Sequence, residues 1–78
     1  MSKWIVQQEF YLWDESLSVF KDEFSSEKEA RDFFSEKRNE FLSSTEEHEF
    51  EVQIDTPNLL HLEDWRKNGL FLSIREKK

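Results

Sequence analysis

The 78-residue chain contains no cysteine, one glycine and one proline, and each of these shortages excludes a class of structure or function. Without cysteine, the chain has neither disulfides nor thiolate-ligated metal sites. A single glycine excludes the glycine-rich loops that hold phosphate groups. Because glycine and proline are so scarce, the composition is typical of an ordered chain and not of a linker or a disordered tail.

Long apolar runs are also missing. No stretch approaches the roughly 18 apolar residues that a membrane-spanning helix needs, and residues 1–8 lack the apolar segment of a secretory signal. A chain of this length has room for one hydrophobic core, so residues 1–78 are predicted to form a single domain. Together these absences predict a cytoplasmic protein without a membrane partner.

Basic residues are outnumbered by acidic ones, 11 to 18, which gives a net charge of −7. The imbalance is uneven: residues 9–64 hold 17 acids and 5 basic residues, whereas residues 65–78 hold 5 basic residues and one acid. A surface that is negative over most of its area repels nucleic acid and attracts basic proteins or cations. We therefore expect a protein partner with a basic surface and no direct binding to nucleic acid.

Aromatic and β-branched residues predict strands on either side of a helix. Residues 3–13 are predicted to form the first strand, and apolar side chains on both of its faces indicate an interior strand or a covered outer face. Residues 14–16 are predicted to turn the chain, so that residues 17–24 pair back as a second strand. Eight Phe, three Trp and one Tyr are expected to fill one dense core.

The helix is the clearest element of the pattern. Ser26 and Glu29 have the spacing of a capping box, in which each side chain satisfies a free amide at the helix start. Lys37 falls within the apolar stripe of the helix, and we expect its stem to be covered while its ammonium reaches water. Residues 43–45 are expected to end the helix. At 100° per residue, the stripe predicted to face the core consists of Ala30, Phe33, Phe34 and Phe41.

In residues 48–55, His48 and apolar side chains alternate with acidic or amide side chains. This pattern is typical of a half-buried antiparallel strand with one solvated face. Residues 59–69 are compatible with a short strand or a loop, with a turn predicted at Asn68-Gly69. Residues 70–75 are predicted to form a final strand. The order β-β-α-β-β predicts an α+β fold, with one amphipathic helix packed on one face of a small antiparallel sheet.

Catalytic motifs such as G-x-S-x-G and H-E-x-x-H are absent. His61 with Glu63 or Asp64 as the orienting carboxylate, and Ser73 as a distant nucleophile, is one candidate for acid–base chemistry. A metal held by His48, His61 and a glutamate from residues 46–49 is another, but neither spacing is specific. We therefore predict a protein that is not an enzyme and that needs neither a cofactor nor a metal.

The acidic residues fall into two rows whose repeats, about 6 Å along a helix and about 6.7 Å along a strand, imitate a nucleic-acid backbone. The helical row lies beside the apolar stripe and consists of Glu29, Asp32, Glu36 and Glu40. The row on the strand consists of Glu49, Glu51 and Asp55. Trp13 and Trp65 are added as partner-binding residues, because tryptophan is enriched in binding hot spots and both lie near element ends.

The predicted function is a small acidic interaction module. In its most concrete form it inhibits a nucleic-acid-binding protein by occupying that protein's basic surface. In the alternative, the acidic residues only keep the protein soluble through its net charge. Binding to a partner or homodimerisation then uses an apolar patch on the first hairpin around Tyr11 and Trp13. In size, acidity and lack of catalytic motifs, the chain is similar to small inhibitors encoded by phages and other mobile elements.

Overall fold

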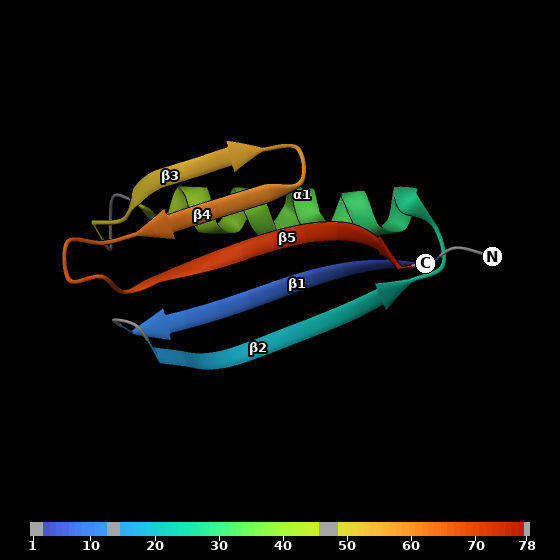
Figure 1. The fold of residues 1–78 in the computed structure, drawn as a ribbon. Coiled ribbons are helices and arrows are strands. Elements are labelled where there is room, and N and C mark those ends of the chain that lie inside the picture. Colours follow the sequence, from blue (N-terminus) through green and yellow to red (C-terminus); the bar gives the residue numbers. More distant parts are fainter. Residues whose placement is uncertain (1–2, 13–14, 46–48, 78) are drawn as a thin grey trace.

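A five-stranded antiparallel sheet with the helix α1 on one face forms the described part of the chain, which a computed structural model covers over residues 3–12, 15–45 and 49–77 (Figure 1). The elements are β1 (Lys3–Leu12), β2 (Glu15–Phe24), α1 (Glu27–Ser43), β3 (Glu51–Thr56), β4 (Leu59–Glu63) and β5 (Gly69–Lys77). The strand order is β2-β1-β5-β4-β3, so β1 and β5 are neighbours inside the sheet. The predicted α+β fold is confirmed.

Two segments differ from their predicted roles. Glu15 and Ser16, expected in a turn, belong to β2, while Trp13 and Asp14 lie outside the described residues. The segment 59–69, which the sequence left open, supplies β4 and a turn. The described chain therefore has one strand more than the predicted order, and β1 is the interior strand that its two apolar faces indicated.

Side-chain hydrogen bonds mark both ends of α1. The Ser26 hydroxyl oxygen accepts the backbone N–H of Glu29 at 3.2 Å, which forms one half of the predicted capping box. At the other end, the hydroxyls of Ser43, Ser44 and Thr45 each donate to the carbonyl oxygen three residues earlier, at 2.8, 2.9 and 2.9 Å. The Ser44 backbone N–H also donates to the Phe41 carbonyl oxygen at 3.2 Å, so hydroxyls and this amide together satisfy the last carbonyls and end α1 without a glycine.

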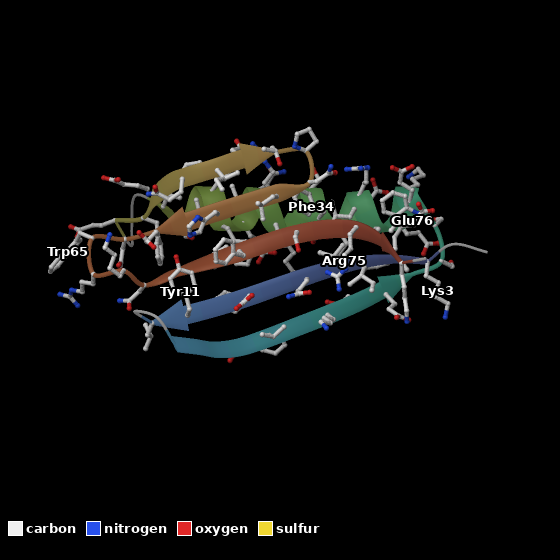
Figure 2. All side chains as sticks on the ribbon, viewed as in Figure 1. Lys3, Tyr11, Phe34, Trp65, Arg75 and Glu76 are labelled. Atoms are coloured by element: carbon white, nitrogen blue, oxygen red, sulfur yellow. The ribbon has the colours of Figure 1, made fainter. Side chains whose placement is uncertain are left out.

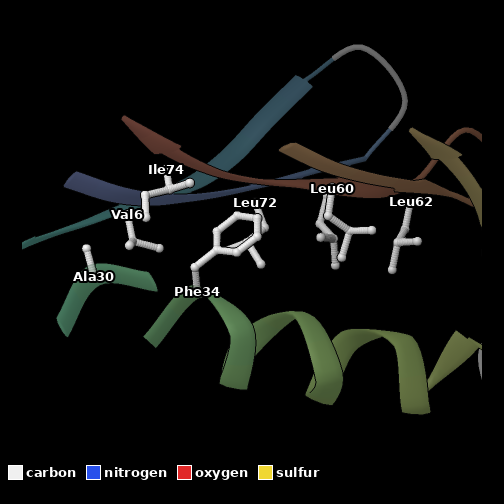
Figure 3. Packing of buried hydrophobic residues seen from close by; sticks show 8 residues of the cluster. Val6, Ala30, Phe34, Leu60, Leu62, Leu72 and Ile74 are labelled. Carbon is white, nitrogen blue, oxygen red and sulfur yellow. The ribbon is translucent and has the colours of Figure 1, made fainter. Parts of the chain in front are cut away.

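The buried core lies between α1 and the strands β1, β5 and β4, as Figure 3 shows. Among the described aromatic residues only Phe34 is buried, at 5% exposure, so the expected dense aromatic core is wrong. Leucines on β4 and β5 face each other across the strands and already fill the space over the middle of the sheet. The core cluster consists of Val6, Ala30, Phe34, Leu60, Leu62, Leu70, Leu72 and Ile74.

The apolar stripe of α1 is only partly buried. Phe33 and Phe41 lie at the border of the core, and the Phe33 ring packs on Phe24 of β2 with their centroids 5.2 Å apart. The Lys37 side chain is 31% exposed, and its ammonium lies 3.3 Å from Glu40, which agrees with the predicted covered stem. Within the described part of the chain, no helix combines the length and the apolar character that crossing a bilayer requires.

Strand β3 differs most from its prediction. All six residues are exposed, including Val52 at 48% and Ile54 at 38%, so the predicted half-buried face is wrong. β3 is an edge strand, and its pairing with β4 slips between Val52 and Ile54, which leaves Gln53 as an extra residue. Such a bulge reverses the faces of the residues that follow it. The alternation in the sequence therefore does not continue through the strand.

The turn between β4 and β5 depends on Asp64. Its carboxylate accepts the backbone N–H of Arg66 at 2.8 Å and that of Asn68 at 2.9 Å. Lys67 takes the left-handed conformation, with a φ of 69°. The predicted turn at Asn68-Gly69 is therefore displaced toward Asp64, because the aspartate closes the turn before Gly69 is reached.

Gly69 is the first residue of β5 and has no positive φ. Its role is steric: a Cβ built on it would overlap the carbonyl oxygen of Leu62 and lie 2.6 Å from the Tyr11 hydroxyl. The absence of a side chain thus allows β4, β5 and the Tyr11 ring to meet.

We expect Phe34→Ala to lower the free energy of unfolding by about 3–5 kcal/mol, because it removes the buried ring between α1 and the sheet and leaves a cavity. Urea denaturation followed by circular dichroism measures the change. Phe20→Ala is the matched control, since Phe20 is 54% exposed, and its expected loss is below about 1 kcal/mol. Equal losses in the two variants would contradict the placement of Phe34 in the core.

Candidate functional site

The two flanks of α1 contact different parts of the sheet. On one flank, Arg31 donates to the Asn58 side chain at 3.1 Å. Arg38 on the same flank forms a two-pronged ion pair with Asp55, with its Nε at 3.0 Å and its Nη2 at 2.6 Å from the carboxylate oxygens. The other flank borders β2 through Phe33 and Lys37, and Glu29 lies beside Phe24 at the end of β2. Helical spacing puts Glu36 and Glu40 on this same flank.

A groove of about 470 Å³ separates this second flank from β2. In Figure 1, α1 runs behind β4 and β5, while β2 lies at the far edge of the sheet. Phe20 of β2 is 54% exposed, although its ring makes an edge contact with Phe10 at a centroid distance of 6.1 Å. We call this feature the α1–β2 groove; it is lined by Gln8, Phe10, Phe20, Lys21, Asp22, Phe33 and Lys37.

The four acids predicted on the helix are all exposed: Glu29, Asp32, Glu36 and Glu40. Lys28 pairs with Asp32 at 2.9 Å, and Lys37 pairs with Glu40 at 3.3 Å. Glu29 and Glu36 form no ion pair with the residues that the structure describes. Since exposed ion pairs contribute only about 0–1 kcal/mol, a partner's cation can replace Lys28 or Lys37.

The predicted row of acids on β3 does not form. Glu51 pairs across the strands with Glu63, on the sheet face turned away from α1. Asp55 pairs with the buried Leu60, so its side chain points to the helix, where it meets Arg38. The bulge in β3 separates Glu51 from Asp55, and the Asp55 charge is neutralised within the chain.

Trp65 is 70% exposed and projects at the end of the sheet, in the turn between β4 and β5 (Figure 2). The Arg66 guanidinium lies 4.6 Å from the ring centroid, and the indole N–H donates to the Glu49 carboxylate at 3.1 Å. Glu49 precedes β3 and has a φ of 58°. The structure thus joins Trp65 to Glu49 and not to the acids of α1, while Trp13 lies outside the described residues.

The sheet face turned away from α1 carries a cluster of which the sequence analysis named only His61 and Glu63 together and missed the contacts with Tyr11 and Phe71. The Tyr11 hydroxyl lies 2.7 Å from His61 Nε2 and donates to the Glu63 carboxylate at 2.9 Å. His61 stacks on Phe71 with a centroid distance of 4.1 Å and an interplanar angle of 12°. Figure 2 shows Tyr11 on this uncovered face. The cluster joins β1, β4 and β5, so only the strand order brings its members together.

The side chains of this cluster satisfy one another. Because the Tyr11 hydroxyl proton goes to Glu63, His61 Nε2 acts as the donor to the Tyr11 oxygen. The expected pair of His61 with Glu63 is therefore joined through Tyr11, whose hydroxyl is not a free anchor for a partner. Among the described residues no three metal-ligating side chains gather, and residues 46–48 of the metal hypothesis lie outside them.

We expect the pKa of Tyr11 to lie well above its ordinary value near 10, first because burial disfavours the phenolate and second because Glu63 is hydrogen-bonded and negative. A tyrosine whose pKa is raised by folding stabilises the protein fully below the unfolded pKa, and this contribution is lost as the pH rises through the folded pKa. Tyr11 is the only tyrosine and the three tryptophans do not ionise, so the pH-dependent change in near-ultraviolet absorbance follows Tyr11 alone.

Glu63→Gln is expected to lower the pKa of Tyr11, since it removes the negative charge beside the hydroxyl. Glu51→Gln is the matched control, because Glu51 lies opposite Glu63 but does not contact Tyr11. An ordinary tyrosine pKa in the folded parent protein would contradict the described cluster.

The candidate functional site is the acidic flank of α1 together with the α1–β2 groove. It combines exposed carboxylates with an exposed ring, whereas contacts within the chain occupy Asp55, Glu49 and the Tyr11 hydroxyl. Comparison with protein-family models, with curated proteins and with solved structures finds no match to this chain.

Proposed function

We propose that the chain is a small, acidic, non-enzymatic module that binds a protein partner with a basic surface. The observation that supports this proposal is that the half-exposed Phe20 ring and Asp22 line a groove beside the helix flank that carries the exposed Glu36 and Glu40, although Lys21 and Lys37 line the groove as well. The net charge of −7 adds a negative field that attracts basic proteins from a distance. The docking face consists of the α1–β2 groove and the flanking acids Glu29, Glu36 and Glu40.

The two kinds of group have different effects on binding. Glu36 and Glu29 lack an ion pair among the described residues, so a partner's lysine or arginine gains an attraction without breaking an existing contact. Charge complementarity of this kind mainly raises the association rate and selects the partner. Phe20 supplies a ring that a partner can bury, and a few such well-packed side chains carry most of the binding energy in protein interfaces.

In its most concrete form, the proposal makes the chain an inhibitor that occupies the basic surface of a nucleic-acid-binding protein. The acids of α1 support this form, because Glu36 and Glu40 repeat at about 6 Å along the helix. Strand β3 supplies no second row, since Asp55 is paired with Arg38. A single row beside an apolar groove therefore has to provide the recognition.

Self-association through the first hairpin is a second candidate. Val19 and Phe20 of β2 are 49% and 54% exposed, which favours an apolar contact on this hairpin. Two copies that each carry a charge of −7 repel one another. Salt screens this repulsion, so a homodimer is expected to tighten with salt, whereas the complex with a basic partner weakens.

We expect Glu36→Lys/Glu40→Lys to weaken capture of basic partners by at least about tenfold, since about 1.4 kcal/mol of lost attraction is a factor of ten. The measurement is affinity capture from source-cell lysate by the immobilised chain, with the bound proteins identified and then titrated singly. Titrations near 0.1 M and 1 M salt, where the screening length falls from about 10 Å to about 3 Å, are expected to show weaker binding at high salt.

Glu51→Lys/Glu76→Lys is the matched control: both residues are exposed, and the variant has the same net charge as Glu36→Lys/Glu40→Lys. It should bind nearly as well as the parent chain. Displacement of the captured partner by DNA or RNA would support the inhibitor form. Binding that ignores both salt and the reversal on α1 would refute the proposal.

A further inference from the structure

The two edges of the sheet differ in how well they are protected against a further strand. β3 has six residues, contains a bulge, is followed by Pro57 and is joined to α1 through Asp55 and Arg38. β2 has ten residues and contains no proline, and no described strand pairs with its outer side. Bulges, prolines, short length and charged side chains, lysine especially, keep an edge strand from pairing with another chain. β3 combines the first three, whereas β2 has charged side chains such as Lys21 and a register shift between Ser16 and Ser18, which leaves Ser18–Phe24 regular.

The regular part of β2 is long enough to accept a strand. The segment Ser18–Phe24 pairs with Trp4–Phe10 in an unbroken register, because the irregularity with β1 comes between Phe10 and Tyr11. Its outward row of N–H and C=O groups is therefore straight over a length at which strands commonly pair.

The side chains of this segment point to both faces of the sheet. Phe20, opposite Gln8, projects toward the α1–β2 groove, and Asp22, opposite Val6, follows it on the same face. Val19 lies on the other face, and both apolar residues are about half exposed, at 49% and 54%. A strand added beside β2 would cover Phe20 and bring its own side chains next to Asp22.

The charge of this region selects the occupant. The groove is lined by Asp22 and by Lys21 and Lys37. Lys37 is paired with Glu40, and Glu36 is exposed on the same flank of α1 without an ion pair among the described residues. A second copy of the chain would bring another net charge of −7 to the same edge, which opposes self-pairing. Lysine or arginine in the added strand would instead meet Asp22 and be attracted by the negative net charge, while Lys37 on the helix side is already paired with Glu40.

We propose that the basic partner binds by adding an extended segment to the free edge of β2, as a sixth strand of the sheet. An apolar side chain of that segment packs on Phe20 in the α1–β2 groove. Basic residues two positions away on either side reach Asp22, whichever way the strand runs, and face Glu36 and Glu40. Backbone hydrogen bonds give affinity in this mode, and the alternate side chains give specificity. The inference rests on the proposed function and specifies its binding mode.

The test uses the full chain and the capped peptide Thr-Lys-Thr-Leu-Thr-Lys-Thr, which places two lysines around a leucine on one face of a strand. Titration of the ¹⁵N-labelled chain by NMR is expected to shift the amide signals of Ser18–Phe24. A scrambled peptide of the same composition, and the same peptide with alternate backbone amides methylated, are each expected to bind at least about tenfold more weakly, because alternation and edge hydrogen bonds are lost.

Two variants separate side-chain from backbone effects. Phe20→Ala is expected to weaken peptide binding several-fold, whereas Val52→Ala on β3 is the matched control, since Val52 is 48% exposed on the other edge and should leave binding unchanged. Circular dichroism of each variant confirms that the fold is retained.

Equal binding of the scrambled and alternating peptides, with shifts confined to the α1 acids, would overturn strand addition but leave the basic-partner function standing. Loss of salt-sensitive capture from lysate would remove that function itself. A dimer that forms without peptide, strengthens with salt and shifts the β2 amides would overturn the proposal in favour of a second copy at this edge.

Discussion

The antiparallel pairing of β1 with β5 is the constraint on which the rest of the structure depends. It joins the ends of the described chain, from Lys3 opposite Lys77 to Tyr11 opposite Gly69, and brings Val6 opposite Ile74 beneath α1. With β4 added beyond β5, these strands form the aliphatic surface that the helix covers. Because α1 lies over this surface, β2 extends beyond the helix and leaves the α1–β2 groove between them.

The same arrangement makes the two sides of the helix unequal. On the β3 side, Arg38 reaches Asp55, and this contact joins the outer hairpin to α1. On the β2 side, aromatic contacts such as Phe24 with Phe33 hold the strand near the helix, but no ion pair between described residues joins α1 to β2. The β3 side is thus joined to α1 by an ion pair, whereas on the β2 side Glu40 pairs with Lys37 of the helix itself and Glu36 forms no ion pair among the described residues. This asymmetry supports the proposed docking face.

Aromatic residues surround the core and do not fill it. Phe10 connects Phe20 to Phe41 along the groove, while Tyr11 and Phe71 lie with His61 on the uncovered face of the sheet. A ring at a border position can bury one side against the fold and present the other to water or to a partner. The high aromatic content therefore contributes to the surface as much as to stability.

What the sequence by itself determined depends on contacts between near neighbours. The capping residues around α1 and the strand-forming side chains of β1 and β5 are local patterns, and the net charge is a simple sum, so the helix, these strands and the acidity were predictable. Only the tertiary structure decided which strands became edges, because strand order depends on pairing between distant segments. That strand order leaves all of β3 exposed, places Asp55 next to Arg38 and brings Tyr11 next to His61. It also crowds Gly69 so closely that a side chain there would overlap its neighbours. A period of two residues along a strand does not encode any of these outcomes.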